Sequence, residues 1–435
     1  MSTTFSVPAN HPQRYLLNNE VHARPCTSLY APERTSHLAL LMTSEQQAQE
    51  REAIAILCER YIKSPPASGT THFSVDLGPF RMRWEQHGEF STYTFYVHGP
   101  YDDPFTEPAL EAVPAEWVQS LPGQLIVGCH ATIVQSDEEG ADLDVISPLF
   151  SDNTLIGSEV SGGAAQVFTD FRIHADGFGR FLIYDRRLRS RQLGRLLQRM
   201  FEIEVYRMMA LLTFPIARRL IPVLSEADQR LLSITTGMSQ ADRDEAQLLD
   251  DLTGLAAEVE HSQSSTQFRL SASQAYFRLV ELRINELREE RIRGIQTLAE
   301  FMDRRLGPAM NTCASIERRQ IALSKRIARA SQLLRTRVEI TLERQNQSLL
   351  ESMDRRAKLQ LRLQETVEGL SVAAITYYAV SLIGYVAKAG KAAGLAIKPD
   401  LVIGISIPVV ALLVTVGVRF IRRMVEKAQK QSPES

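Results

Sequence analysis

The chain has 435 residues, of which 44% are hydrophobic and 23% charged, and its formal net charge is -2. These ordinary fractions exclude a mostly disordered or collagen-like chain. Four cysteines outside any CxxC pattern exclude a disulfide scaffold and favour a reducing compartment. The small net charge is a cancellation, because residues 1–180 hold 10 Lys/Arg against 23 Asp/Glu, a balance of -13, whereas residues 181–435 hold 39 against 28, a balance of +11.

Residues 1–185 alternate between strand and helix patterns, which predicts an acidic cytoplasmic α+β domain. A strand is expected over 37–42, followed by a helix that starts at Ser44, where Gln47 completes a capping box, and ends near Tyr61. Further strands are predicted at 71–78, 80–88, 89–99 and 123–134, and in a hairpin over 164–186 with its turn at Asp176-Gly177. We therefore expect a mixed or antiparallel sheet with helices on one side.

Strand patterns end near Arg187, and residues 186–368 are expected to form a helical, coiled stalk region. Helices are predicted near 187–212, 216–235, 239–260 and 265–304. A last helix begins near Pro308, and because no other Pro follows before Pro399 it is expected to reach residue 386, a length of about 115 Å. Apolar residues at three- and four-residue steps predict a packing seam along it: Ile316, Leu323, Ile327, Ala330 and Leu334, continued by Val338, Leu342, Leu349 and Met353.

Two uncharged runs near the C-terminus are long enough to cross a bilayer as helices. They cover 369–387 and 401–418, and at about 1.5 Å per residue each just spans a hydrocarbon core of about 30 Å. The alternative is a pair of helices buried in a soluble core, but both runs are apolar all round and lack an amphipathic stripe. The sequence predicts two C-terminal transmembrane helices, with the lipid bilayer as a partner.

The charges around the two runs predict their orientation. Lys and Arg are frequent before the first run and in the basic tail 419–435, while the connecting loop 388–400 has three lysines. The N-terminus lacks the charged and apolar regions of a signal peptide. The positive-inside rule then favours both termini in the cytoplasm and a short external loop.

The segment 11–25, HPQRYLLNNEVHARP, together with the two C-terminal runs, resembles an uncharacterised family of bacterial membrane-anchored proteins. NEVHARP is its most specific mark. Because that family has no established activity, the resemblance implies only a bacterial inner-membrane location and this topology. The layout is also similar to that of CorA-type magnesium transporters, which implies a ring of subunits around a stalk-lined axis. The CorA family carries Gly-Met-Asn at the end of its first span, where this chain has Gly384-Tyr385-Val386, and the lysine-rich loop here repels divalent cations.

A polar stripe approaches and enters the first predicted span. Its members recur at three- and four-residue steps and are pore-lining candidates: Gln360, Gln364, Ser371, Tyr378, Ser381 and Tyr385. In a homo-oligomer such a face would line an axial path. The alternative is a helix–helix interface in which the hydroxyl groups bond their own backbone.

The NEVHARP segment is the second candidate site. It supplies an acid, an imidazole and a guanidinium that share one face of an extended chain, within the residues Asn19, Glu20, His22, Arg24 and Pro25. These groups suit acid–base chemistry or anion binding. The alternative is a structural cap in which Arg24 pairs with an acid of the front domain and Pro25 fixes a turn.

Other ligands have weaker support. The acidic stretches 102–107 and 137–144 could hold Mg²⁺ or Ca²⁺ loosely between subunits, or they could be solvated loops. No EF-hand spacing is present, so the sequence leaves a metal site unknown. No zinc spacing, phosphate loop or dinucleotide fingerprint is found, and no cofactor is expected. Arg191, Arg195 and Arg199 form a basic stripe without interleaved aromatic residues, so nucleic acid is not an expected partner.

Three functions of different class follow. The preferred one is a homo-oligomeric, CorA-like membrane protein with a cytoplasmic regulatory domain that conducts divalent or other ions. The second is a non-transporting, membrane-anchored scaffold or sensor. The third is a membrane-anchored enzyme that uses Glu20, His22 and Arg24. The first two involve no catalytic residues.

Overall fold

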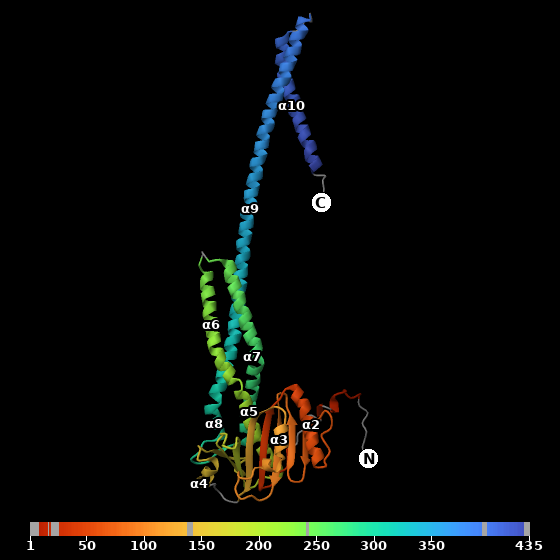
Figure 1. Ribbon diagram of the computed structural model, residues 1–435. Coiled ribbons are helices and arrows are strands. Elements are labelled where there is room, and N and C mark those ends of the chain that lie inside the picture. The colour runs from red at the N-terminus through yellow and green to blue at the C-terminus, as the bar shows by residue number, and fades with distance from the viewer. Residues whose placement is uncertain are drawn as a thin grey trace. The chain divides into compact units, whose positions relative to one another are not determined.

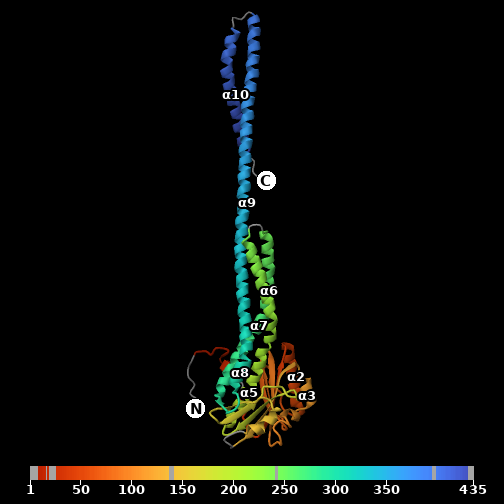
Figure 2. The same cartoon turned by 90° about the vertical axis from the view of Figure 1, so that its left-hand side faces the viewer.

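The computed structural model describes residues 8–15, 17–18, 26–136, 142–240, 243–393 and 398–429. The chain divides into two compact units, residues 1–331 and 332–435. The first contains a sheet and most of the helices (Figure 1). The second contains the end of the long helix α9 (Gly307–Ala392) and the helix α10 (Pro399–Gln429), which runs back alongside it (Figure 2).

The described strands of the first unit form one mixed sheet. In chain order they are β1 (Glu33–Leu41), β2 (His72–Asp76), β3 (Arg81–Gln86), β4 (Phe90–His98), β5 (Gln124–Gln135), β6 (Ile156–Val160), β7 (Ala165–Thr169), β8 (Gly179–Asp185) and β9 (Glu290–Arg291). Their spatial order is β2-β3-β4-β1-β5-β8-β7-β6-β9. β5 and β8 pair in parallel, and the other neighbouring strands pair antiparallel. The predicted mixed sheet is therefore confirmed.

The remaining described helices of the first unit are α2 (Ser44–Arg60), α3 (Ala115–Ser120), α4 (Leu143–Ile146), α5 (Ser190–Leu211), α6 (Phe214–Met238), α7 (Glu245–Leu287) and α8 (Leu298–Arg305), with short 3₁₀ turns at Ala109–Ala112 and Ser147–Phe150. The capping box of α2 is formed by Thr43 and Gln46, one residue before the predicted pair. The strand β1 likewise ends one residue before the expected position, at Leu41.

Two predicted helix boundaries are wrong. The break expected between residues 260 and 265 lies inside α7, because the hydroxyl groups there are satisfied without breaking the helix: Thr266 donates to the Ser262 carbonyl at 2.7 Å and accepts from Gln320 at 3.2 Å. The helix expected to reach residue 304 ends at Leu287. The separate helix α8 starts after the N-cap Thr297, which forms a capping box with Glu300. The Glu289 carboxylate also accepts hydrogen bonds from the backbone N–H groups of Leu298 and Ala299.

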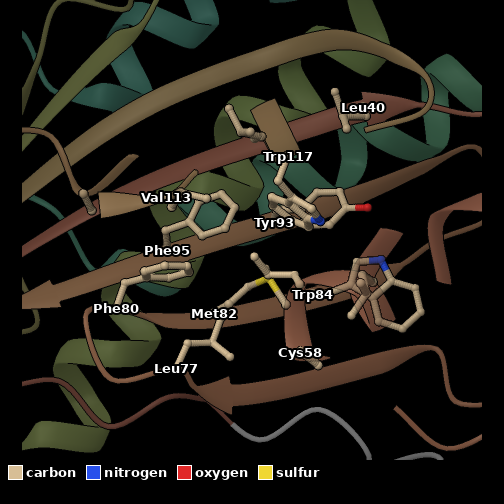
Figure 3. Packing of buried hydrophobic residues seen from close by; sticks show 14 of the residues in the cluster. Leu40, Cys58, Leu77, Phe80, Met82, Trp84, Tyr93, Phe95, Val113 and Trp117 are labelled. Atoms are coloured by element: carbon tan, nitrogen blue, oxygen red, sulfur yellow. The ribbon is translucent and has the colours of Figure 1, made fainter. Parts of the chain in front are cut away.

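Helices cover both faces of the sheet, so the expectation of helices on one side is wrong. Alternate residues of β1, β3 and β4 pack with α2 and α3 in an apolar cluster that includes Trp84, Tyr93, Phe95 and Trp117 (Figure 3). The side chains between them point to the opposite face, where the His37 ring of β1 stacks on Phe201 of α5. The central strands are consequently buried from two sides.

One carboxylate lies within the apolar cluster. Glu50 of α2 is fully buried. It accepts hydrogen bonds from Trp84 Nε1 at 2.7 Å, Ser91 Oγ at 2.9 Å and the Tyr93 hydroxyl at 2.7 Å. Burial raises the pKa of Glu50 above its ordinary value, an effect that these three donors counteract. Glu50 therefore ties α2 to β3 and β4.

The first turns of α9 pack with α6 and α7. Arg319 pairs with Asp228 of α6 at 2.9 Å, and Gln320 bonds Thr266 of α7. The first part of the predicted seam is buried at every position: Ile316, Leu323, Ile327, Ala330 and Leu334. Its continuation is not, since Leu342, Leu349 and Met353 are more than half exposed. The seam thus contributes to a helical bundle only over its first half.

Replacing Glu50 by Ala should destabilise the first unit by about 3 kcal/mol or more, because three buried donors would lose their acceptor and each unsatisfied donor costs about 1–3 kcal/mol. Glu52→Ala is the matched control, since Glu52 lies on the same helix and is exposed. Its effect should stay within about 0.5 kcal/mol. Denaturation of both variants, followed by circular dichroism, measures the difference. Equal stabilities of the two variants would contradict the structural role of Glu50.

Candidate functional site

A cavity of about 240 Å³ lies between the second face of the sheet and α5. Its floor is formed by β1, β3 and β4. Its wall is one face of α5, whose lining residues recur at three- and four-residue steps from Gly194 to Tyr206, as expected for a single helix face. Arg283 of α7 closes one side. The cavity is therefore built by elements distant in the sequence.

The alternation of the strands explains why this cavity is polar. In β3, Arg83 lies between the apolar-cluster residues Met82 and Trp84, and in β4 the residues Thr92, Thr94 and Tyr96 alternate with Tyr93 and Phe95. Arg83, Thr92 and Thr94 are each only 6% exposed. Such buried polar groups require partners inside the protein.

The charged groups of the cavity are paired. Arg83 donates to Glu85 at 2.8 Å. Arg283 pairs with Glu202 of α5 and with Glu286 of its own helix, the latter at 3.1 Å. Two arginines and two glutamates thus line the cavity, and their charges balance. The lining offers no net field for a strongly charged ligand.

His37 is a buried titratable group of the lining. Its Nδ1 lies 2.8 Å from Thr94 Oγ1, and its ring lies parallel to that of Phe201 at 4.4 Å. Burial lowers the pKa of His37 to about 3, helped by the nearby charges of His87 and Arg83, so the imidazole is neutral at pH 7. Its Nε2 has no hydrogen-bond partner among the residues that the structure describes.

Gln198 of α5 also has one satisfied and one unsatisfied end. Its Nε2 donates to Glu202 at 2.7 Å. Its Oε1 is buried and has no hydrogen-bond partner within the described parts of the chain. Gln198 and His37 both belong to the cavity lining, and each has one polar atom that no described residue satisfies.

The chain before β1 crosses α5 next to the cavity. A β-carbon on Gly194 would lie 1.8 Å from the Thr27 carbonyl oxygen, so only glycine fits there. Leu29 N donates to the Ser190 carbonyl at 3.1 Å. The thiol of Cys26 has its pKa raised by burial, against the opposing charge of Arg83. The predicted motif residues before Cys26, namely Asn19, Glu20, His22, Arg24 and Pro25, lie outside the described residues.

A second, more open cavity of about 590 Å³ lies on the α3 side of the sheet and contains His130. The His130 ring stacks on Phe178 at 4.1 Å, and its Nδ1 lies 2.9 Å from Ser36 Oγ. Burial lowers the pKa of His130 to about 4. The sequence shows no zinc spacing around Cys129 and His130, and strand alternation turns these two neighbouring side chains to opposite faces of the sheet.

The pore-lining candidates divide into two groups. Gln360 and Gln364 are exposed on α9, as are Ser371 and Tyr378. Ser381 and Tyr385 instead line a groove of about 550 Å³ between α9 and α10, together with Thr376, Tyr377 and Lys388. At this groove a β-carbon on Gly384 would lie 3.1 Å from Ile403 Cδ1, so the two helices approach closely. The six residues do not line one surface in the single chain.

No metal centre is formed by the described residues, among which no group of three or more His, Cys, Asp or Glu side chains is placed to hold an ion. Residues 137–141 of the acidic stretch 137–144 lie outside the description. Of the three basic-stripe arginines, Arg199 pairs with Glu286 of α7 at 2.9 Å.

The family model described as a protein of unknown function (DUF3422) matches residues 9–425. The chain belongs to the DUF3422 family. The match covers most of the chain, as the resemblance to an uncharacterised family implied. Comparison of this DUF3422 protein with curated proteins and with solved structures gives no match.

Sequence reasoning missed the cavity between the sheet and α5, although one signal was present. His37 of β1 begins the apolar run 37–42, and Arg83 lies between two apolar residues in β3. A polar residue in a strand that is otherwise buried is a reason to look for a site on the second face of a sheet.

The stability of the DUF3422 protein should fall in acid because of His37 and His130. Both pKa values are lower in the folded chain than the ordinary 6.5, at about 3 and about 4. Protonation therefore favours the unfolded state, and stability is full above pH 6.5 and declines as the pH falls from 6.5 toward these values. The slope is about 1.4 kcal/mol per pH unit for each histidine.

The thermal midpoint, measured between pH 7.5 and 4.5 in detergent, checks this expectation. The variants His37→Gln and His130→Asn should each show a shallower decline with acid than the unchanged chain, whatever their stability at pH 7.5. Three parallel pH profiles would mean that other groups cause the decline.

Proposed function

We propose that this protein is a membrane-anchored sensor, in which a hairpin of α9 and α10 crosses the bilayer twice and holds the cavity-bearing α/β domain at the membrane. Among the described residues, three helical segments are long and apolar enough to cross a membrane, within Ser190–Met238, Gly307–Ala392 and Pro399–Ile421. The last segment carries the proposal, because only 6% of its most apolar window is buried inside the protein.

The exposed apolar side chains of the second unit support a lipid environment. Leu370, Leu382, Leu412 and Leu413 are each 65% or more exposed. Burying one such side chain is worth about 1.5–3 kcal/mol, so their shared exposure to water would be costly. Soluble proteins rarely present so continuous an apolar surface. The bilayer is the solvent that fits this unit.

The segment Ser190–Met238 is better explained as part of the soluble domain. One third of its most apolar window is already buried inside the protein, twice the share of the α9 window. α5 packs on β5 and α7 and contains the buried pair Glu204 and Arg207, whose Nε–Oε2 distance is 2.9 Å. Arg218 and Arg219 follow in α6. Charged residues at these positions would be expensive in a lipid-facing helix.

The flanking charges support an inner-membrane location with both termini in the cytoplasm. The loop 388–400 would then be external and the tail 419–435 cytoplasmic, where its lysines and arginines meet anionic headgroups. In this topology the cavity faces the cytoplasm. A ligand that binds there is sensed by a domain that the hairpin holds at the bilayer.

A charge-insertion experiment tests the anchor. The double variant Leu382→Arg/Leu412→Arg should lose resistance to alkaline carbonate extraction, because each Arg near a span centre costs about 2.5–3.5 kcal/mol on the insertion scale. The matched control Leu333→Arg/Leu350→Arg adds the same charge to exposed sites of α9 outside the span and should remain in the membrane pellet. Extraction of the unchanged chain by carbonate would overturn the proposal.

A second candidate, ion conduction by a CorA-like homo-oligomer, is favoured by one observation. Ser371 and Tyr378 are exposed on α9, Tyr378 to 73%, and they are not part of the groove lining between α9 and α10. Polar groups within a span are costly against lipid, and a ring of further copies would place them on a protein or water surface. The α/β domain would then be regulatory, and divalent or other ions the cargo.

Flux assays in liposomes test this candidate. The uptake of K⁺, Na⁺ and Mg²⁺ by the reconstituted protein should fall severalfold in Ser371→Leu and Tyr378→Leu. Thr376→Val is the control, because the Thr376 hydroxyl already donates to the Val372 carbonyl of its own helix at 2.7 Å. Absence of flux for all three ions in the unchanged protein would exclude conduction and leave the anchored sensor.

A further inference from the structure

The cavity between the sheet and α5 contains two buried polar atoms that the protein leaves unused. His37 is 6% exposed, and its Nδ1 is satisfied by Thr94 while its Nε2 is not. Gln198 Oε1 on the opposite wall is likewise without a partner among the described residues. Leaving a buried polar atom unsatisfied costs about 1–3 kcal/mol, so two at one cavity point to a bound molecule that completes them.

The two atoms define the hydrogen bonds that such a molecule must offer. Gln198 Oε1 is an acceptor and requires a donor from the ligand. His37 Nε2 donates if Nδ1 accepts from Thr94 and accepts if Nδ1 donates to it, so the ligand needs a complementary group there. A molecule with both a donor and an acceptor on its edge satisfies either tautomer.

The other lining groups restrict the shape and charge of the ligand. Four aromatic residues line the cavity, namely Phe90, Tyr96, Phe201 and Tyr206, and aromatic rings favour flat ligands that stack or meet them edge-on. The two arginines are already paired with acids, so a phosphate, a carboxylate or a zwitterion would have to break an ion pair. A sugar would carry more hydroxyl groups than the two unused atoms can satisfy.

The volume sets the size. At about 240 Å³ the cavity is slightly smaller than the roughly 300–1,000 Å³ of pockets for drug-sized ligands, so its ligand is small.

We propose that this cavity binds one small, planar, uncharged nitrogen heterocycle, which donates a hydrogen bond to Gln198 Oε1 and pairs with His37 Nε2. A nucleobase or a nicotinamide-like ring has this chemistry. The inference rests on the proposed function, because it names the ligand class of the sensor's cavity. It also assigns α5 a role: the helix supplies both the hydrogen-bonding Gln198 and the aromatic Phe201 that supports His37.

Calorimetry and thermal-shift assays on the full chain in detergent test this assignment. The probes are adenine, cytosine, uracil and nicotinamide, compared with glucose, glutamine, succinate and inorganic phosphate. At least one heterocycle should bind saturably and raise the thermal midpoint, and the other four probes should not. Stronger binding of a sugar, a zwitterion or an anion would overturn the proposal, as would the absence of binding by every heterocycle, which would mean a cavity filled by solvent.

Two variants locate the site. Gln198→Leu removes the acceptor at nearly constant size and should weaken heterocycle binding about tenfold, the equivalent of one hydrogen bond. Gln263→Leu is the matched control, because Gln263 lies on α7 outside the cavity lining and also has an unsatisfied buried Oε1. Unchanged affinity in Gln198→Leu would contradict the site.

His37→Phe provides a second check that does not depend on Gln198. It retains the stack on Phe201 but removes both imidazole nitrogens, so heterocycle binding should fall at least tenfold while the circular dichroism spectrum is unchanged. Retained affinity in this folded variant would overturn the role of Nε2.

Carbonate extraction is measured on the same preparations. A failure of ligand binding with an intact membrane pellet would reject the ligand class and not the anchor.

Discussion

The two-sided burial of the central strands is the constraint on which the rest of the first unit depends. β1, β3 and β4 are covered by α2 and α3 on one face and by α5 on the other, so neither set of alternating side chains can face water. One set is apolar and packs as an ordinary core. The other contains His37, Arg83 and Thr94, which can be buried only if each finds partners. The cavity lies where this pairing is incomplete.

The same constraint explains the distribution of charge. The acidic first part of the sequence meets the arginine-rich helices inside one unit. Arg269 of α7 pairs with Glu89 of the β3–β4 turn at 2.8 Å, and Tyr276 of the same helix donates to that carboxylate at 2.8 Å. Arg186 pairs with Glu159 at 3.3 Å. The opposite signs of the two halves are therefore partly neutralised within the chain, and partly left to the exposed basic residues around α9 and α10.

Much of this fold could be predicted from the sequence, because its elements have strong local signals. The period-two strands, the hairpin at Asp176-Gly177 and the uninterrupted helix after Pro308 depend on residues close in the sequence. The merging of two predicted helices into α7 could not be foreseen, since Thr266 is satisfied by Gln320, which is 54 residues away. Local preference for a break was overridden by a tertiary contact.

The candidate site was harder to predict for the same reason. Gln198 is four residues from Glu202, and that contact is visible from helix spacing. That Gln198 and His37 line the same cavity depends on which face of the sheet α5 covers, and the expectation of helices on one side concealed it. The motif residues 19–25, which have the stronger sequence signal, lie outside the described chain.

The glycine at position 194 has a consequence for how this protein can be shortened. Since the Thr27 carbonyl lies where a side chain would be, residues 26–29 fill the space above that turn of α5, and Leu29 is only 1% exposed. A fragment that begins at the first strand would remove this cover and open the adjacent helix to water. The stretch before the sheet therefore acts as part of the fold, and any minimal domain has to include it.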